Sequence, residues 1–175
     1  MVKGLPLSEG ELQLLESLVR HRVRFMVVGL SAAALQGAPV VTEDVDLWFE
    51  NLNDLKLTRA LKAVGAGYVP PFGFNAPMLA GRHTEPFDVV IRMDGLGPFE
   101  EEFKTSPKVR VGRLKLAVLS LERIIASKIA ANRSKDKLVI PILQSTLRTL
   151  RVNNKIKHKS ARHGKQRAQN RQRHG

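Results

Sequence analysis

The sequence contains no cysteine, few aromatic residues and no long apolar run. The absence of cysteine among its 175 residues excludes disulfide bonds and thiolate metal sites, which suits a reducing compartment. No apolar stretch approaches the roughly 18 residues of a membrane-spanning helix, so no membrane partner is expected. The opening residues, MVKGLPLSEGEL, contain no signal-peptide hydrophobic region. We therefore expect a cytoplasmic protein.

Acidic residues are missing from the end of the chain, and this sets that segment apart. Residues 151–175 carry nine of the 29 Lys and Arg residues, three of the five His and none of the 16 acids. Val152 and Ile156 are its only large aliphatic residues, too few to offset the entropy lost on folding. We predict one domain over residues 1–150 and a basic tail over 151–175, disordered or conditionally helical. Such a tail either binds RNA phosphates through counterion release or only keeps the protein soluble.

Hydrophobic periodicity predicts a mixed fold of helices and strands. Leucines at helical spacing predict a helix over 8–22, with Ser8 and Glu11 as a capping box. Pro141 is expected to kink the last helix or reset its start. The other elements predicted in chain order are strand 23–29, helix 31–36, strand 43–50, helix 54–65 capped by Asn53, irregular connection 67–81, strand 85–93, hairpin or strand and turn 108–120, helix 121–133, and a helix from Ser134 toward Leu150. This order predicts an α+β (α/β-like) fold: a small mixed sheet flanked by helices, with a C-terminal helical segment.

Three aspartates interrupt the apolar strands. Asp44 and Asp46, at i and i+2, are expected on one face of strand 43–50, and Asp88 lies on a later strand. Buried carboxylates repel one another, and a hard divalent cation such as Mg²⁺ relieves that repulsion. If the two strands are neighbours, these acids form the floor of a two-metal phosphoryl-transfer site. Taken alone, each acid better fits a solvated strand position, and it is the ordered combination that indicates a metal site.

A glycine turn precedes the aspartates. Gly29 ends the strand VRFMVVG and leads into a short helix, which would bring backbone N–H groups and the Ser31 hydroxyl near phosphates. The alternative is structural, with Gly29 serving the turn and Ser31 capping the helix.

The ordered set of motifs resembles the nucleotidyltransferase fold of the DNA polymerase beta superfamily. The pattern T-x-D-h-D, where h is a hydrophobic residue, appears as TEDVD (42–46). More narrowly, the chain resembles bacterial stand-alone nucleotidyltransferase-like proteins, whose relatives include toxins of toxin–antitoxin pairs. Their G-x-x-A-x-x-x-x-G pattern matches GLSAAALQG (29–37), and their K-x-x-A-x-R-x-K-D pattern matches KIAANRSKD (128–136). The resemblance covers roughly residues 10–150.

The resemblance implies roles for individual residues. Asp44, Asp46 and Asp88 would be the catalytic metal ligands for Mg²⁺, with two ions possible. Gly29 and Ser31 would lie near the nucleotide phosphates. Lys128 would point toward the triphosphate. Arg133, with Lys135 and Asp136, would order the following turn or contact the nucleotide. For Lys135 and Asp136, a structural role in ion pairs between helices and in helix caps is an equally good interpretation.

The implied activity is transfer of a nucleoside monophosphate from an NTP, the substrate, to a hydroxyl of RNA such as tRNA, or of a protein. The resemblance also suggests a toxin with a cognate antitoxin as partner. The alternative is a catalytically weak module of the same fold that binds nucleic acid or a protein through its basic tail.

Overall fold

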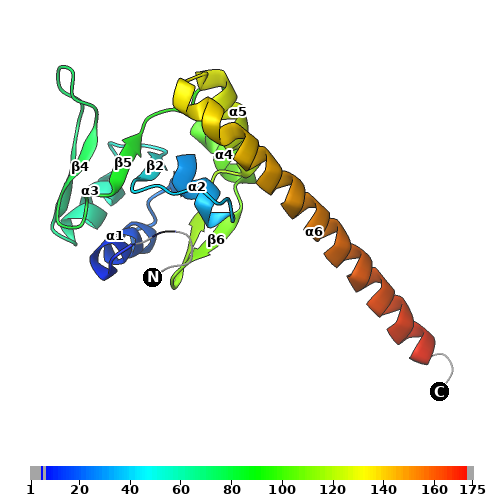
Figure 1. The fold of residues 1–175 in the computed structure, drawn as a ribbon. Helices are drawn as coiled ribbons and strands as arrows, with labels where there is room; N and C mark the ends of the chain where they lie inside the picture. Colours follow the sequence, from blue (N-terminus) through cyan, green and yellow to red (C-terminus); the bar gives the residue numbers. More distant parts are fainter. Residues whose placement is uncertain (1–4, 6, 173–175) are drawn as a thin grey trace.

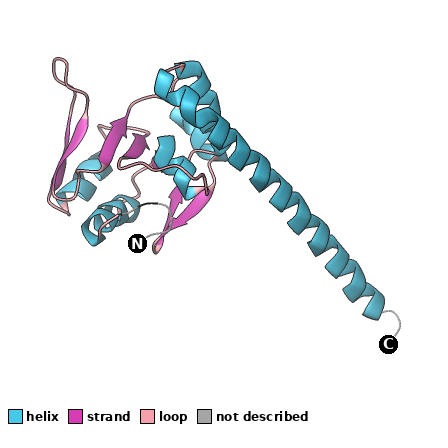
Figure 2. Ribbon diagram, in the orientation of Figure 1, coloured by secondary structure: helices cyan, strands magenta, loops and turns pink. Residues whose placement is uncertain are grey.

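The structure is a computed structural model that describes residue 5 and residues 7–172, with the backbone alone described from residue 156 onward. Helices and strands alternate through the first half of the chain, and helices dominate the second half (Figures 1 and 2). The helices are α1 (Glu9–Arg20), α2 (Gly29–Leu35), α3 (Leu55–Lys62), α4 (Phe99–Thr105), α5 (Leu121–Ala131) and α6 (Ser134–Gln172). The strands are β1 (Phe25–Val27), β2 (Val45–Phe49), β3 (Ala66–Val69), β4 (Met78–Gly81), β5 (Phe87–Val90), β6 (Lys108–Val111) and β7 (Leu114–Ala117). The predicted α+β class is confirmed.

Five strands form one mixed sheet in the order β1-β2-β5-β4-β3, and β6 and β7 form a separate hairpin. Strands β2 and β5 are parallel, whereas the other neighbours in the sheet are antiparallel. The hairpin predicted over 108–120 is confirmed by the β6–β7 pairing. The parallel pair brings together the two strands that carry Asp46 and Asp88.

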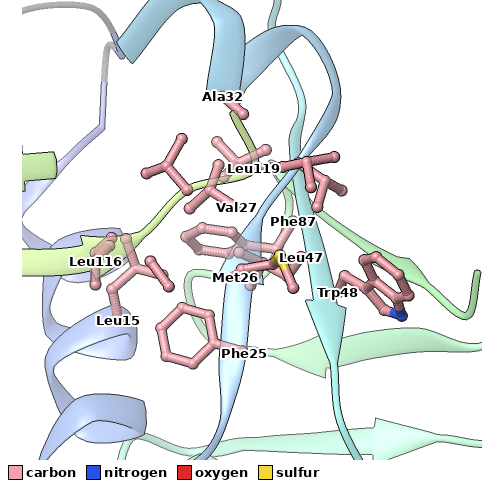
Figure 3. Close-up of a cluster of buried hydrophobic side chains, with 14 of the residues drawn as sticks. Leu15, Phe25, Met26, Val27, Ala32, Leu47, Trp48, Phe87, Leu116 and Leu119 are labelled. Carbon is pink, nitrogen blue, oxygen red and sulfur yellow. The ribbon is translucent and has the colours of Figure 1, made fainter. Parts of the chain in front are cut away.

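The core lies where α1, α2 and the start of α5 pack around β1 and β2. Figure 3 shows Leu15, Phe25, Met26 and Leu47 within a cluster of buried hydrophobic side chains, and each is at most 5% exposed. Burying side chains of this size stabilises a fold by about 1.5–3 kcal/mol each. Trp48 extends the core toward α4. Its ring packs edge-to-face against the ring of Phe99, with the two ring centroids 5.6 Å apart. The core thus holds β2 firmly, and β2 in turn positions Asp46.

Capping follows local sequence rules. Ser8 and Glu11 form the predicted capping box of α1, with each side chain bonded to the other residue's backbone N–H. The cap predicted for α3 was displaced by one residue. Asp54, rather than Asn53, accepts a hydrogen bond from the backbone N–H of Lys56. Asn51 instead accepts from the backbone N–H of Asn53, which puts Asn53 inside the preceding turn.

The prediction of an irregular connection over 67–81 was wrong. Strands β3 and β4 pair antiparallel in full register from Ala66↔Gly81 to Val69↔Met78. The prolines that suggested a loop, Pro70, Pro71 and Pro77, all lie in the turn between the strands, where no ladder N–H is needed. The turn carries two strongly exposed aromatic side chains, Phe72 and Phe74.

Helix α6 begins in the domain and then leaves it (Figure 1). It contains Pro141, and no new helix begins at that residue, so the predicted reset of the start was wrong. Leu143 is fully buried, and Leu147 and Leu150 pack against the core. The helix continues to Gln172, past the predicted domain boundary at residue 150. Residues 173–175 of the predicted tail lie outside the described residues. No helix in the described part of the chain is long and apolar enough to span a bilayer.

Candidate active site

Asp46 and Asp88 occupy paired positions on the two parallel strands. Asp46 of β2 is the register partner of Asp88 of β5, and Met78 of β4 flanks Asp88 on its other side. Register partners on adjacent strands point to the same face of a sheet. Two carboxylates more than 40 residues apart in sequence are therefore neighbours at the centre of the sheet.

Asp44 lies just outside the strand. It is exposed, precedes the first residue of β2, and its carbonyl accepts a hydrogen bond from Thr42 Oγ1 at 3.1 Å. Its position two residues before Asp46 keeps its charge within range of the Asp46 carboxylate. The structure thus places Asp44 at the edge of the acidic pair.

Burial and the neighbouring acidic residues disfavour the ionised form of Asp46. Burial, together with the charges of Asp88 and Asp44, raises the pKa of Asp46 from 3.8 to about 6, against the opposing effect of Lys128 and Lys135. A carboxylate whose ionised form is penalised by burial and by like charges is a candidate functional group. The same charges that destabilise it would attract a cation.

Gly29 lies against the Asp46 carboxylate. Its φ of +63° is a left-handed conformation, and a Cβ placed on it would stand 2.0 Å from Asp46 Oδ2. The backbone N–H of the preceding residue, Val28, donates to the Asp46 carbonyl at 2.9 Å. The turn from β1 into α2 is therefore fitted to Asp46, and only glycine combines this backbone conformation with this close approach.

Ser31 faces the interior. Its side chain is fully buried, and its Oγ donates to the Val28 carbonyl at 2.9 Å, within the first turn of α2. The alternative that Ser31 caps the helix was wrong, because the N-cap of α2 is Val28 and no side chain caps it. In the described conformation the hydroxyl serves the helix start.

The segment KIAANRSKD forms a connection between two helices. Lys128 Nζ of α5 donates to Asp136 Oδ1 of α6 at 2.6 Å, and both side chains are largely buried. Between them Asn132 takes a left-handed φ of 51°, which turns the chain from α5 into α6. The ion pair fixes this turn, and the charge of Lys128 acts to lower the pKa of Asp46.

Two basic residues of the same motif remain exposed. Arg133 Nη2 donates to Asp94 Oδ2 at 2.9 Å, and Lys135 is solvent-exposed while still lowering the pKa of Asp46. Sequence reasoning missed Asp94 as the partner of Arg133. The residue follows the strand that carries Asp88 and precedes Gly95, a turn signal that marks its position but not its partner.

Comparisons with known proteins identify the fold. No family model and no curated protein matches the chain. A crystal structure of ANT(2″)-Ia in complex with adenylyl-2″-tobramycin matches at 12% identity with a TM-score of 0.55, covering 86% of this chain and 95% of that one. The solution structure of the antibiotic-resistance factor ANT(2″)-Ia matches at 12% identity with a TM-score of 0.53, covering 88% and 94%. An antigenic nucleotidyltransferase-like protein from Paracoccidioides brasiliensis matches at 19% identity with a TM-score of 0.50, covering 82% and 78%.

The chain has the nucleotidyltransferase fold. The structural similarity extends over most of the chain. It agrees with the fold that the sequence motifs, GLSAAALQG, TEDVD and KIAANRSKD, predicted. At these identities the comparison establishes the fold alone. The chemistry of this nucleotidyltransferase-fold chain has to be argued from its own side chains.

The acidic residues suit Mg²⁺, the ion expected from the resemblance. Within the described residues, no three His, Asp or Glu side chains are grouped closely enough to hold a metal ion by themselves. Mg²⁺, however, is commonly bound by one or two carboxylates, with waters and substrate phosphates completing its shell. Asp46 and Asp88 are such a pair, and burial with the charges of Asp88 and Asp44 disfavours the ionised form of Asp46 when no cation is bound. The donor chemistry therefore fits a magnesium–nucleotide complex.

Proposed function

We propose that this protein transfers a nucleoside monophosphate from an NTP to a hydroxyl acceptor in a Mg²⁺-dependent reaction. The observation that carries the proposal is the Asp46–Asp88 pair on parallel strands, closed on one side by Gly29. Lys128 and Lys135 are near enough to act on the Asp46 charge, and they supply positive charge beside the pair. Adjacent carboxylates and amines of this kind suit a triphosphate bound with a cation.

Each residue has a role in this proposal. Asp46 and Asp88 would hold the ion, with Asp44 near its outer side. Bound Mg²⁺ would neutralise charge on the phosphates. Gly29 leaves room for phosphate oxygens beside Asp46, because any side chain there would fill that space. Lys135 is exposed and free to meet the outer phosphates, whereas Lys128 is paired with Asp136 and would act mainly as a nearby charge.

The reaction consists of one displacement. The acceptor hydroxyl oxygen bonds to the α-phosphorus, the bond from that phosphorus to the bridging oxygen breaks, and pyrophosphate leaves. The hydroxyl proton passes to a carboxylate, and we assign this to Asp88, which is exposed to solvent beside the half-buried Asp46. No histidine is required.

The solved structures support a nucleotide donor without defining the acceptor. ANT(2″)-Ia is described in complex with an adenylylated compound, which agrees with nucleotide transfer on this fold. For this chain we propose a hydroxyl of RNA, such as a tRNA end, or of a protein. A toxin role with a cognate antitoxin is a further proposal that rests on the motif resemblance alone.

The test uses NTPs labelled at the α or the γ phosphate. Wild-type protein is incubated with each NTP, Mg²⁺, and either total RNA or total protein, and it is compared with Asp46→Asn. Glu43→Gln is the matched control, because it removes an exposed acid next to Asp44. We expect α label, and not γ label, in one acceptor pool with wild type and Glu43→Gln, and at least about a hundredfold less with Asp46→Asn.

Two results would refute the proposal. One is the absence of transfer with every NTP together with no Mg²⁺-dependent nucleotide binding. The other is equal transfer by wild type and Asp46→Asn, which would show that the label comes from another enzyme or another site.

A further inference from the structure

The apolar stripe that docks helix α6 ends at Leu150. Leu143, Leu147 and Leu150 recur at helical spacing and face the core. The next positions of that stripe are Asn154 and Lys157. Arg151 still reaches Glu122 of α5 at 3.3 Å, and residues 152–155 are all exposed. Beyond Arg151 the helix extends away from the domain, as Figure 1 shows.

The extension carries charge of one sign. Asp136 is the last acidic residue of the chain, and residues 155–172 contain seven Lys and Arg residues. These residues span about 27 Å of helix at 1.5 Å per residue. Double-stranded nucleic acid carries one phosphate charge per about 1.7 Å of axis, so a helix of this length can face many phosphates at once.

The sequence of residues 155–172 does not favour a stable helix in the absence of a partner. Like charges four residues apart, such as Lys155 with Lys159 and Arg167 with Arg171, destabilise an isolated helix, and Gly164 costs about 1 kcal/mol more. In proteins most of the stability of a helix comes from tertiary packing of an apolar face rather than from helix propensity. A polyanion alongside would remove the repulsion and stabilise the helix.

Other partners fit less well. A helix that enters a protein groove needs apolar anchors at i, i+3, i+4 and i+7, and a helix that lies on a membrane needs an apolar face. Residues 155–172 offer only Ile156, Ala161 and Ala168 as apolar side chains, and their spacing forms no such face. We propose that residues 155–172 form a nucleic-acid-binding arm that contacts the phosphodiester backbone without reading sequence, and that becomes stably helical on binding. This inference does not depend on the proposed transferase activity.

The test compares two triple substitutions in the full chain. Lys155→Gln, Lys159→Gln and Arg162→Gln together remove three charges from the arm, and Lys56→Gln, Arg59→Gln and Lys62→Gln remove three exposed charges from α3 as the matched control. Affinity for short DNA and RNA duplexes is measured by fluorescence anisotropy between about 50 and 200 mM salt. Circular dichroism of the protein with and without duplex reports helix formation. Binding to vesicles that contain phosphatidylserine is measured separately.

We expect the arm variant to bind both duplexes at least about tenfold more weakly at about 100 mM salt, with the slope of log K against log salt reduced by about 2–3. The control should bind like wild type, and helicity should rise when wild type binds a duplex. Equal slopes for the two variants would overturn the proposal. Capture of wild type by the vesicles without binding to either duplex would also overturn it, in favour of a membrane surface.

Discussion

Gly29 and Asp46 lie in direct contact, so close that a Cβ on Gly29 would stand 2.0 Å from Asp46 Oδ2. The contact joins the turn after β1 to the carboxylate of β2. It couples a backbone conformation to the position of a candidate metal ligand, and a single substitution tests that coupling.

Gly29→Ala should displace the Asp46 carboxylate. The variant should lose about 1–2 kcal/mol of unfolding free energy from the strained φ of +63°, and nucleotide transfer should fall much further. Gly37→Ala is the control, because Gly37 has a φ of +94° with nothing within 4 Å of the added Cβ. Urea unfolding and the transfer assay measure the two effects. A similar loss of activity in both variants would mean that strain alone, and not contact with Asp46, is responsible.

Asp46→Asn should stabilise the apo protein at high pH. Since the folded-state pKa of Asp46, about 6, lies above its ordinary 3.8, the ionised carboxylate destabilises the fold fully above pH 6. That penalty fades as pH falls from 6 toward 3.8. We expect the variant to gain about 1–2 kcal/mol at about pH 8 and almost nothing near pH 4. Urea unfolding at both pH values measures this, with Glu43→Gln as control. A gain that is independent of pH would contradict an origin in the ionised carboxylate.

Mg²⁺ should stabilise the wild-type protein through the same carboxylates. At a concentration about ten times its dissociation constant, Mg²⁺ would add about 1.4 kcal/mol, or a rise in Tm of about 3–6 °C for a chain of this size. Asp46→Asn and Asp88→Asn should each abolish the rise, and Glu43→Gln should retain it. Thermal unfolding with and without the ion tests this apart from catalysis. A rise retained by both Asp variants would place the ion elsewhere.

Lys128→Ala should destabilise the fold more than Arg133→Ala. Removing Lys128 leaves the carboxylate of Asp136, only 4% exposed, without its partner, at a cost of about 3 kcal/mol or more. The Arg133–Asp94 pair is exposed, at 59% and 36%, and its loss should cost no more than about 1 kcal/mol. Urea unfolding compares the two, and Lys128→Met with Asp136→Leu should recover much of the loss. Equal costs for the two single variants would argue against a buried pair.

Local signals in the sequence predicted what local physics controls. The capping box of Ser8 and Glu11 spans one helical turn, so its residues meet whenever the helix forms. The β6–β7 hairpin likewise connects neighbouring segments. The connection over 67–81 was misjudged because its prolines and glycines signal a turn. Whether the flanking residues pair as strands depends on β5, which provides the sheet edge on which β4 forms.

The sequence by itself determined the order of most elements, though not β3, β4 or α4, together with the positions of the three aspartates and the uneven charge of the chain, because spacing and composition are written in it directly. Only the tertiary structure decided that Asp46 faces Asp88, that Ser31 turns inward, and that Lys128 pairs with Asp136. Each of these depends on which strands and helices become neighbours. That choice is made by burial of the common core around β1 and β2, a sum over many side chains that no short motif contains.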